Sequence, residues 1–452
     1  MKFRKFGNAL LMSALSAGVA LSVTSCVQSY SVGYLYVTGT QTSGSNANAN
    51  GIISGFKIDH NTGNLTAIHG LPVASGGANP VRAVLLAGSR FLYVLNRGVN
   101  SSNESDCTTA TPCQASITQF AVGGNGVLSQ QPETFYPQGS NSSRLIADSS
   151  GSFLYVLDHD SPSAAACALA LGSTVTSCGD ITAFKVDTST GRLTLLVNAQ
   201  VTSASGAALP YFPVPSEPID FTLASGYLLT LSGTPGATAN AGDSVFPYTY
   251  SSSTGQLTVN QNSSQPVSAG AGTALVYGGG YLYLLDNEPI TITSGTSFAA
   301  GTYLGQILPF TIGTNGALQA QTGGAVPTDT AQTNPIYLVV ESKGKWVYVA
   351  NQGNNASTTN TQSGIVGYVL DPSTHQLDFM SGSPFGSGAG PQCMLEDPSD
   401  QFIYTANFND STVTGRVIDQ NSGVLNNLPG KANKSFTLNG PATWCVVSGR
   451  TS

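Results

Sequence analysis

The sequence predicts an all-β fold, a seven-bladed β-propeller with four antiparallel strands in each blade, from three phrases that recur in a fixed order. The first is an aromatic strand, the second is a tight turn that ends in leucine, and the third is a short apolar strand that often begins with proline. Four strands in each repeat and a spacing of roughly sixty residues are typical of large propeller blades. We name the apolar strand A, the aromatic strand B, and the two strands that flank the tight turn C and D.

The aromatic strand B combines a large ring, an apolar residue and usually a tyrosine followed by valine. Its copies are residues 34–37, 91–94, 153–156, 227–230, 281–284, 346–349 and 402–405. Aromatic and β-branched residues favour strands. These copies therefore predict seven blades.

The tight turn between strands C and D ends in a glycine, one further residue and a leucine. Its copies are residues 63–65, 126–128, 191–193, 255–257, 316–318, 375–377 and 423–425. Glycine supplies the positive φ that a hairpin tip needs. His375 replaces this glycine in one copy, and we interpret it as a turn residue because histidine tolerates this region of backbone conformation.

The apolar strand A begins at Pro80, Pro218, Pro335 and Pro391 in four of its copies. The chain enters the repeats at a B strand, residues 34–37, and leaves them with a lone A strand, residues 440–447. We therefore expect the last strand to complete the first blade, which closes the ring and removes an open sheet edge.

The first residues predict export and a lipid anchor. Residues 1–25 combine a basic start with an apolar stretch from Gly7 to Val23, as a secretory signal does. They lead into Cys26, at a motif that resembles the lipobox of bacterial lipoproteins, so we expect Cys26 to be lipidated and the protein to lie in the bacterial cell envelope, most simply at the outer membrane. Residues 26–33 would form the tether, 34–447 the propeller and 448–452 a tail.

Composition excludes several classes of partner and cofactor. The formal charge is −7, and it falls to −10 once Lys2, Arg4 and Lys5 are removed with the signal. An acidic chain without a lysine- or arginine-rich cluster argues against binding of nucleic acid. The sequence also shows no nucleotide or haem motif and no cysteine–histidine spacing of a metal site, so we expect no cofactor and no metal. We expect a monomer.

The six cysteines that follow Cys26 predict disulfides, because an exported protein folds in an oxidising compartment. Cys107 and Cys113 bracket one short loop, and Cys167 and Cys178 bracket another. The remaining pair, Cys393 with Cys445, would join neighbouring inner strands.

The three phrases together resemble the lactonase-type seven-bladed propellers. That family includes the bacterial propeller form of 6-phosphogluconolactonase and fungal muconate-lactonizing enzymes, and it grades into YVTN-repeat surface proteins. The resemblance covers residues from about Tyr34 to Val447 and implies the fold. In that family the proline of strand A is often followed by histidine, and no copy here has one.

Candidate site residues lie near the start of strand A, where seven strands converge on the axis. The position two residues after the proline, aligned on the following B strand, is occupied by Arg82, Arg144, Asp220, Ala274, Tyr337, Cys393 and Thr443. We expect Arg82, Arg144, Asp220 and Tyr337 to bind a ligand at the channel mouth, on the face that carries the long B–C loops, because arginines suit the capture of a carboxylate or phosphate. His159, next to Asp158 and Asp160, is the candidate general base. The alternative is that Arg144 pairs with Asp220 and that His159 is simply solvated.

Three functions remain open at this stage. The main hypothesis is a binding or interaction module of the cell envelope with a small-molecule, glycan or protein ligand. The first alternative is a periplasmic lactonase that acts on a sugar or aromatic lactone, and the second is a purely structural surface protein.

Overall fold

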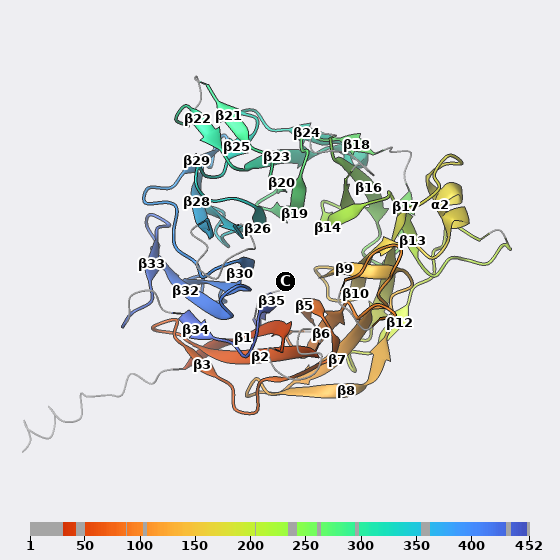
Figure 1. Ribbon diagram of the computed structural model, residues 1–452, viewed down its shortest axis with the longest axis horizontal. Coiled ribbons are helices and arrows are strands. Elements are labelled where there is room, and N and C mark those ends of the chain that lie inside the picture. Colours follow the sequence, from red (N-terminus) through yellow and green to blue (C-terminus); the bar gives the residue numbers. More distant parts are fainter. Residues whose placement is uncertain are drawn as a thin grey trace, which may run out of the picture.

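The structure is a computed structural model, and it describes residues 30–41, 50–86, 88–102, 106–203, 205–233, 242–259, 264–293, 298–353, 362–430 and 435–449. It confirms the seven-bladed β-propeller. Seven separate antiparallel sheets surround a central axis, as Figure 1 shows, and the chain passes from blade to blade in sequence order. The expected signal, residues 1–25, and the lipidation site Cys26 lie outside the described residues.

The bounds of the first four strands are given from the axis outwards in each blade, and where a fifth strand follows it pairs, like the fourth, with the third strand. Blade 1 contains β35 (Ala442–Val447), β1 (Ser31–Thr40), β2 (Asn50–Asp59), β3 (Leu65–Ala67) and β4 (Val73–Ala78), and blade 2 contains β5 (Pro80–Leu86), β6 (Phe91–Asn96), β7 (Ser116–Val122) and β8 (Leu128–Phe135). Blade 3 contains β9 (Ser140–Ala147), β10 (Phe153–Asp160), β11 (Gly179–Val186), β12 (Leu193–Leu195) and β13 (Phe212–Val214). Blade 4 contains β14 (Pro218–Ala224), β15 (Tyr227–Ser232), β16 (Ser244–Tyr250), β17 (Leu257–Val259) and β18 (Gln265–Pro266).

The remaining blades have the same order. Blade 5 contains β19 (Gly272–Gly278), β20 (Tyr281–Asp286), β23 (Gln306–Ile312), β24 (Leu318–Ala320) and β25 (Val326–Pro327), with a separate hairpin of β21 (Ile290–Ile292) and β22 (Gly301–Tyr303). Blade 6 contains β26 (Pro335–Val340), β27 (Trp346–Asn351), β28 (Gly364–Leu370) and β29 (Leu377–Phe379), and blade 7 contains β30 (Pro391–Glu396), β31 (Phe402–Asn407), β32 (Thr412–Ile418), β33 (Leu425–Asn427) and β34 (Ser435–Thr437). A helix, α2 (Ala164–Leu171), lies in the B–C loop of blade 3, and a 3-10 turn, η1 (Thr314–Gly316), joins β23 to β24.

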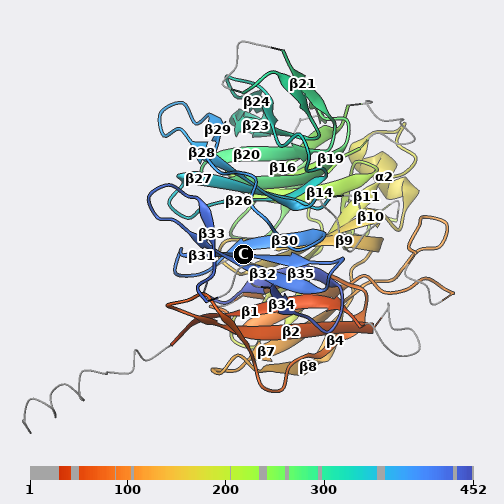
Figure 2. The same ribbon diagram turned by 60° about the vertical axis from the view of Figure 1, so that its left-hand side comes forward.

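The predicted closure of the ring is confirmed. The last strand, β35, pairs antiparallel with β1, with Tyr36 opposite Val446 and Val37 opposite Cys445. The pairing of β35 with β1 brings the first and last described strands together in blade 1, and Figure 2 shows β35 beside β30 of the neighbouring blade 7. The first strand begins at Ser31, earlier than the expected start at Tyr34.

All three predicted disulfides are formed. Cys107 is bonded to Cys113, Cys167 to Cys178, and Cys393 to Cys445. The third bond joins the inner strand of blade 7, β30, to the closing strand β35, and therefore reinforces the closure covalently. No helix among the described ranges has the length and apolar character needed to cross a membrane.

The hydrophobic core is divided among the seven interfaces between neighbouring blades. Each interface buries one cluster of strand residues, for example Val84, Leu154 and Phe184 between blades 2 and 3. A blade that is apolar on both faces is stable only between two neighbours, which is why the repeats form a closed ring.

A buried tyrosine of strand B links most blades to the next one. Tyr36, Tyr155, Tyr348 and Tyr404 each donate a hydrogen bond to the carbonyl of the turn glycine in the following blade, at 2.8, 2.9, 2.6 and 2.6 Å, and Tyr93 does the same. The tyrosine of the first sequence phrase and the glycine of the second are therefore partners in one contact.

The blade 5 tyrosine departs from this rule at the turn that contains His375. The hydroxyl of Tyr283 is buried without a hydrogen-bond partner among the described residues. His375 has φ +57°, as expected for its place at a turn tip, and its ring lies 4.8 Å from that of Tyr281. The sequence interpretation of His375 as a turn residue is thus confirmed.

Candidate functional site

The charged layer of the channel is set by a β-bulge at the start of each inner strand. In blade 2, Pro80 is opposite Asn96 and Arg82 is opposite Leu95, so Val81 is left unpaired. Irregularities at the matching position recur in the inner strands of the other six blades. The bulge turns the residue that follows it towards the axis.

One residue of this layer differs from the sequence expectation. Trp444 is opposite Thr38 and Ala442 is opposite Gly39, so Trp444 and not Thr443 occupies the position equivalent to Arg82. The difference arises because Pro441 lies one residue before the first paired residue, whereas Pro80 is itself paired. A shift of one residue moves a side chain to the other face of a strand.

The four expected ligand-binding residues come together in one cavity. Arg82, Arg144, Asp220 and Tyr337 line a space of about 300 Å³ with Trp444. Its other walls come from the second halves of β9, β14 and β19. The cavity therefore extends from these residues towards the A–B turns, whereas we expected the ligand on the B–C loop side.

The position of Arg144 is fixed by Asp220. The Nε of Arg144 donates to Oδ1 of Asp220 at 3.0 Å, which is the salt bridge considered as the alternative in the sequence analysis. The same carboxylate accepts from the backbone N–H of Phe221 at 2.9 Å and, through Oδ2, from that of Leu275 at 2.9 Å. Because both oxygens are engaged, Asp220 serves to position Arg144 and to join blades 4 and 5.

Arg82 has no such partner. Its Nη1 donates to the carbonyl of Val81 at 2.7 Å, and its guanidinium lies 3.9 Å from the ring centre of Trp444. Among the described residues no carboxylate lies within 4.0 Å of it. Burial, and then the positive charge of Arg144, lower the pKa of Arg82 well below its usual value. Arginine nevertheless remains charged in proteins, so this part of the cavity favours an anion.

Tyr337 and Trp444 form the aromatic wall of the layer. Their rings meet edge to face with centroids 5.2 Å apart. Burial raises the pKa of Tyr337, which keeps its phenol neutral, although Arg82 opposes this effect. Both rings also line a neighbouring space of about 170 Å³ on the side of blades 6 and 7.

His159 lies between two carboxylates. Its Nδ1 is 3.0 Å from Oδ1 of Asp160, and its Nε2 is 3.1 Å from Oε2 of Glu217. Asp160 is itself held by Thr109 at 2.8 Å and by Asn141. These contacts connect the B–C loop of blade 2 with β9 and β10 of blade 3 and with the residue that precedes β14 of blade 4.

Glu217 is a candidate functional residue that the sequence analysis missed. It has φ +55°, and the residues at the equivalent point of other blades have φ from +52° to +67°: they are Asn79, Asn141, Asn334 and Gly390. Glycine and asparagine adopt this conformation readily, while glutamate does so at a cost. Backbone strain of this kind clusters at functional sites. The signal in the sequence was the replacement of Asn-Pro by Glu217-Pro218.

Arg97 adds a third cation near Arg144. It follows strand β6, and its Nη2 donates to the carbonyl of Cys107, inside the loop closed by the Cys107–Cys113 disulfide, at 3.4 Å. Burial lowers the pKa of Arg97, and the proximity of Arg144 adds to this effect, while Asp106 opposes it. The carbonyl of Cys107, within the disulfide-bonded loop, therefore helps to hold the guanidinium of Arg97 near that of Arg144.

Asp158, the neighbour of His159, belongs to the interior of blade 3 rather than to its surface. It is completely buried beside Asp180, and it accepts hydrogen bonds from Ser142 and Thr182. Burial raises the pKa of Asp158 to about 6, and burial with the charge of Asp158 raises that of Asp180 well above its usual value. Asp158 is therefore a structural residue.

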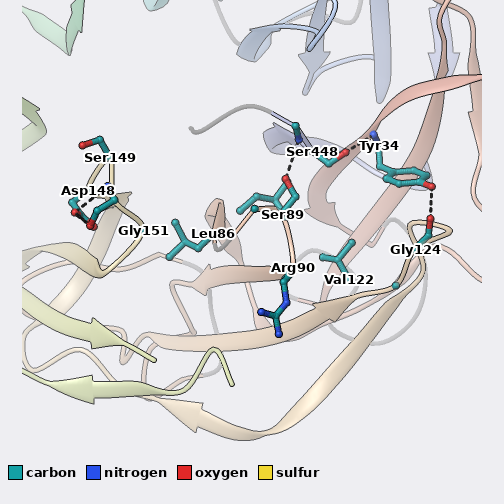
Figure 3. Close-up of a pocket in the computed structure, with 15 residues that line it drawn as sticks. Tyr34, Leu86, Ser89, Arg90, Val122, Gly124, Asp148, Ser149, Gly151 and Ser448 are labelled. Carbon is teal, nitrogen blue, oxygen red and sulfur yellow. Dashed lines mark hydrogen bonds between the residues drawn. The ribbon is translucent and has the colours of Figure 1, made fainter. Parts of the chain in front are cut away.

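A larger cavity, of about 490 Å³, lies at the A–B turns of blades 1 to 3 and is drawn in Figure 3. Its polar groups already have partners inside the protein: Tyr34 donates to Gly124 and to Ser448, and the backbone of Gly449 donates to Ser89. Of its charged residues, Arg90 bonds to the carbonyl of Ser189, and Asp148 accepts from Ser152 and Phe153. The channel cavity is the better candidate, because it holds a guanidinium, that of Arg82, with no carboxylate partner among the described residues.

Within the ranges that the structure describes, no group of three or more histidine, cysteine, aspartate or glutamate side chains is arranged to hold a metal ion. What the site offers is a pair of guanidiniums, a phenol and a histidine flanked by carboxylates.

Comparison with known proteins supports the predicted resemblance. Residues 298–443 match the family described as lactonase, 7-bladed beta-propeller. A search of curated proteins found no match to the chain.

Among the solved structures similar to this chain, several are named as gluconolactonases or 6-phosphogluconolactonases. A putative 6-phosphogluconolactonase from Bacteroides fragilis is 16% identical, with a TM-score of 0.60, over 94% of this chain and 99% of the other. The periplasmic gluconolactonase of Pseudomonas aeruginosa is 17% identical, with a TM-score of 0.59, over 92% of this chain and 99% of the other. At these identities the similarity establishes the fold. The chain is therefore a seven-bladed β-propeller, as its repeated motifs predicted, and its residues 298–443 are similar to the lactonase family of such propellers.

Proposed function

We propose that the protein hydrolyses a lactone, with the scissile carbonyl at the layer formed by Arg82 and Arg144. The family match supports a lactonase better than the binding module that we first favoured. The observation that carries the proposal is the state of Arg82, a guanidinium that lines a cavity and has no carboxylate partner among the described residues.

The chemistry of lactone hydrolysis suits two guanidiniums. Attack of water on the carbonyl carbon creates an oxyanion, and opening of the ring converts it to a carboxylate. A fixed positive charge in a site that excludes water stabilises both species more than it stabilises the neutral lactone. Arg82 is free to meet this charge, and Asp220 holds Arg144 in place for it.

His159 is the candidate base, although it does not line the cavity itself, and it would have to activate a water that reaches the charged layer from the B–C loop side. Asp160 would orient the ring through Nδ1, as a carboxylate does in many catalytic pairs, and Nε2 would take the proton. Glu217 faces Nε2 in the structure, with a half-exposed side chain, so it would have to release the ring or pass the proton on. The proton finally reaches the alkoxide that leaves the ring, which gives a hydroxy acid.

The test is proton release from a panel of lactones in a weakly buffered indicator assay. We expect the purified protein to be active, and we expect Arg82→Ala and Arg144→Ala each to lower kcat/KM by about a hundredfold, the size found for loss of one oxyanion contact. Arg192→Ala is the matched control, because Arg192 is exposed and pairs with Glu133 on the outer strands. Equal activity of all three variants would place the site elsewhere.

Localisation adds a separate proposal. Residues 1–25 and Cys26 support an exported enzyme anchored by lipid in the cell envelope. Replacement of Cys26 by serine should release the protein from membranes, as fractionation and labelling with a fatty-acid probe would show. Retention of Cys26→Ser in the membrane fraction would count against the anchor.

A further inference from the structure

Directly below the charged layer, the channel is lined by a collar of apolar side chains. Because side chains of a strand alternate between its faces, the residues two positions after the charged layer also face the axis. Six of these seven positions line one of the two adjoining spaces, namely Ile146, Thr222, Val276, Val339, Leu395 and Val446, whereas the seventh, Val84, lies in the core between blades 2 and 3. Five of the six are aliphatic.

The polar groups next to this collar are already engaged. The hydroxyl of Tyr277, which lines the cavity beyond Val276, is 2.9 Å from that of Ser225. Both oxygens of Asp220 accept hydrogen bonds within the protein. In the collar itself, Thr222 is the single hydroxyl among the residues named above. A sugar ring placed beside the aliphatic side chains would lose hydrogen bonds to water that these side chains cannot replace, which is costly for every buried hydroxyl.

We infer that the protein selects lactones with an apolar body and discriminates against sugar lactones. The inference rests on the proposed function and specifies its substrate class. The carbonyl, and later the product carboxylate, meets Arg82 and Arg144, while an alicyclic or aliphatic body fills the space beside Ile146 and Val276. Trp444 contacts the same space, and its face is covered by Arg82 at 3.9 Å.

The test measures binding of product-like anions, which needs no turnover. Trp444 is one of two tryptophans in the chain, and the other, Trp346, is buried in the core between blades 6 and 7. Fluorescence of a Trp346→Phe variant therefore reports on the cavity alone, and calorimetry on the unaltered protein checks the result if that variant is unstable. The probes are cyclohexanecarboxylate and gluconate, which carry one carboxylate each. Inorganic phosphate, an anion without a carbon skeleton, measures the contribution of the charge alone.

We expect cyclohexanecarboxylate to bind at least tenfold more tightly than gluconate or phosphate. Val276→Thr keeps the shape of the collar and adds a hydroxyl, so it should weaken cyclohexanecarboxylate severalfold and leave phosphate unchanged. Val369→Thr, on the exposed part of β28, is the matched control and should change neither. Arg82→Ala should weaken all three anions.

Tighter binding of gluconate, or cyclohexanecarboxylate binding that Val276→Thr does not alter, would overturn the inference. These outcomes are separate from those that test the proposed function. Selective binding of cyclohexanecarboxylate without hydrolysis of any lactone would refute the enzyme and leave the apolar-anion site. Hydrolysis of gluconolactone together with preferred binding of gluconate would refute the selection for an apolar body and would support the proposed lactonase activity.

Discussion

The hydroxyl of Tyr404 in blade 7 donates a 2.6 Å hydrogen bond to the carbonyl of Gly63 in blade 1, across 341 positions of sequence. It is the same contact that Tyr36 makes with Gly126 and Tyr155 with Gly255, here used to join the last blade to the first. One repeated interaction thus accounts for both the aromatic strand and the glycine turn of the sequence.

Loss of this contact should destabilise the ring. Tyr404→Phe leaves the carbonyl of Gly63 buried without a donor, and we expect a cost of about 1–2 kcal/mol. The matched control is Tyr283→Phe, since the Tyr283 hydroxyl has no hydrogen-bond partner among the described residues and its removal should be neutral or slightly stabilising. Thermal and denaturant unfolding of both variants would measure the difference, and equal losses in the two would contradict the assignment.

The closing strand should be essential for cooperative folding. Deletion of residues 441–452 removes β35, its pairing with β1 and the Cys393–Cys445 disulfide. We expect the truncated protein to lose its single sharp unfolding transition. Cys393→Ser with Cys445→Ser is the milder test, because it removes only the covalent link, and we expect it to lower stability by about 2–4 kcal/mol and to retain cooperativity. Cooperative unfolding of the truncated chain would refute the closure argument.

Asp158→Asn should stabilise the protein, and more so at high pH. Burial raises the folded-state pKa of Asp158 to about 6 from a usual 3.8. Below pH 3.8 the carboxyl is neutral in the folded and the unfolded protein, and its burial carries no charge penalty. As pH rises through 6 the buried carboxyl ionises, which destabilises the folded protein relative to the unfolded one. Asparagine stands at the equivalent end of strand B in three other blades, at Asn96, Asn351 and Asn407. We expect a gain of about 1–3 kcal/mol at pH 8 and little at pH 4.

The control for this pH dependence is Asp187→Asn. Asp187 is exposed, and hydrogen bonds from Ser189 and Thr190 lower its pKa, so its contribution to stability is present at neutral pH and lost as pH falls. The variant should therefore be less stable than the parent at pH 8 and equal to it at low pH. Melting temperatures of both variants between pH 2 and pH 8 would show opposite trends, with the change for Asp187→Asn below pH 4 and that for Asp158→Asn above it, and a gain for Asp158→Asn that did not vary with pH would reject the buried-acid interpretation.

His159→Gln should separate catalysis from binding. Loss of a general base costs about a hundredfold or more in kcat, while the carboxylate still meets Arg82 and Arg144. We expect the variant to hydrolyse lactones slowly and to bind cyclohexanecarboxylate as the parent does. Full activity of His159→Gln would remove the base that we assign.

The fold was predictable because its information is repeated. Each blade contains its own copy of an aromatic strand and a turn, so one irregular copy, such as the turn at His375, did not obscure the pattern. The convergence of Arg82, Arg144, Asp220 and Tyr337 followed from the same alignment, since equivalent residues of inner strands meet at the axis.

The rest of the site depends on details that a repeat pattern does not contain. Trp444 was missed because Pro441 lies one residue outside the paired strand, which changes the face on which each side chain lies. The role of Asp220 depends on the backbone N–H of Leu275 in another blade. The depth of the cavity depends on the packing of side chains two residues further along, and not on the charged residues themselves.

A crystal structure of the protein with cyclohexanecarboxylate, a stand-in for the carboxylate product, tests the central claim most directly. We predict that the carboxylate accepts hydrogen bonds from the guanidiniums of Arg82 and Arg144 and that the ring lies beside Ile146, Val276 and Trp444. A carboxylate bound instead in the cavity at Ser89 and Ser448, or on the outer strands, would contradict the account.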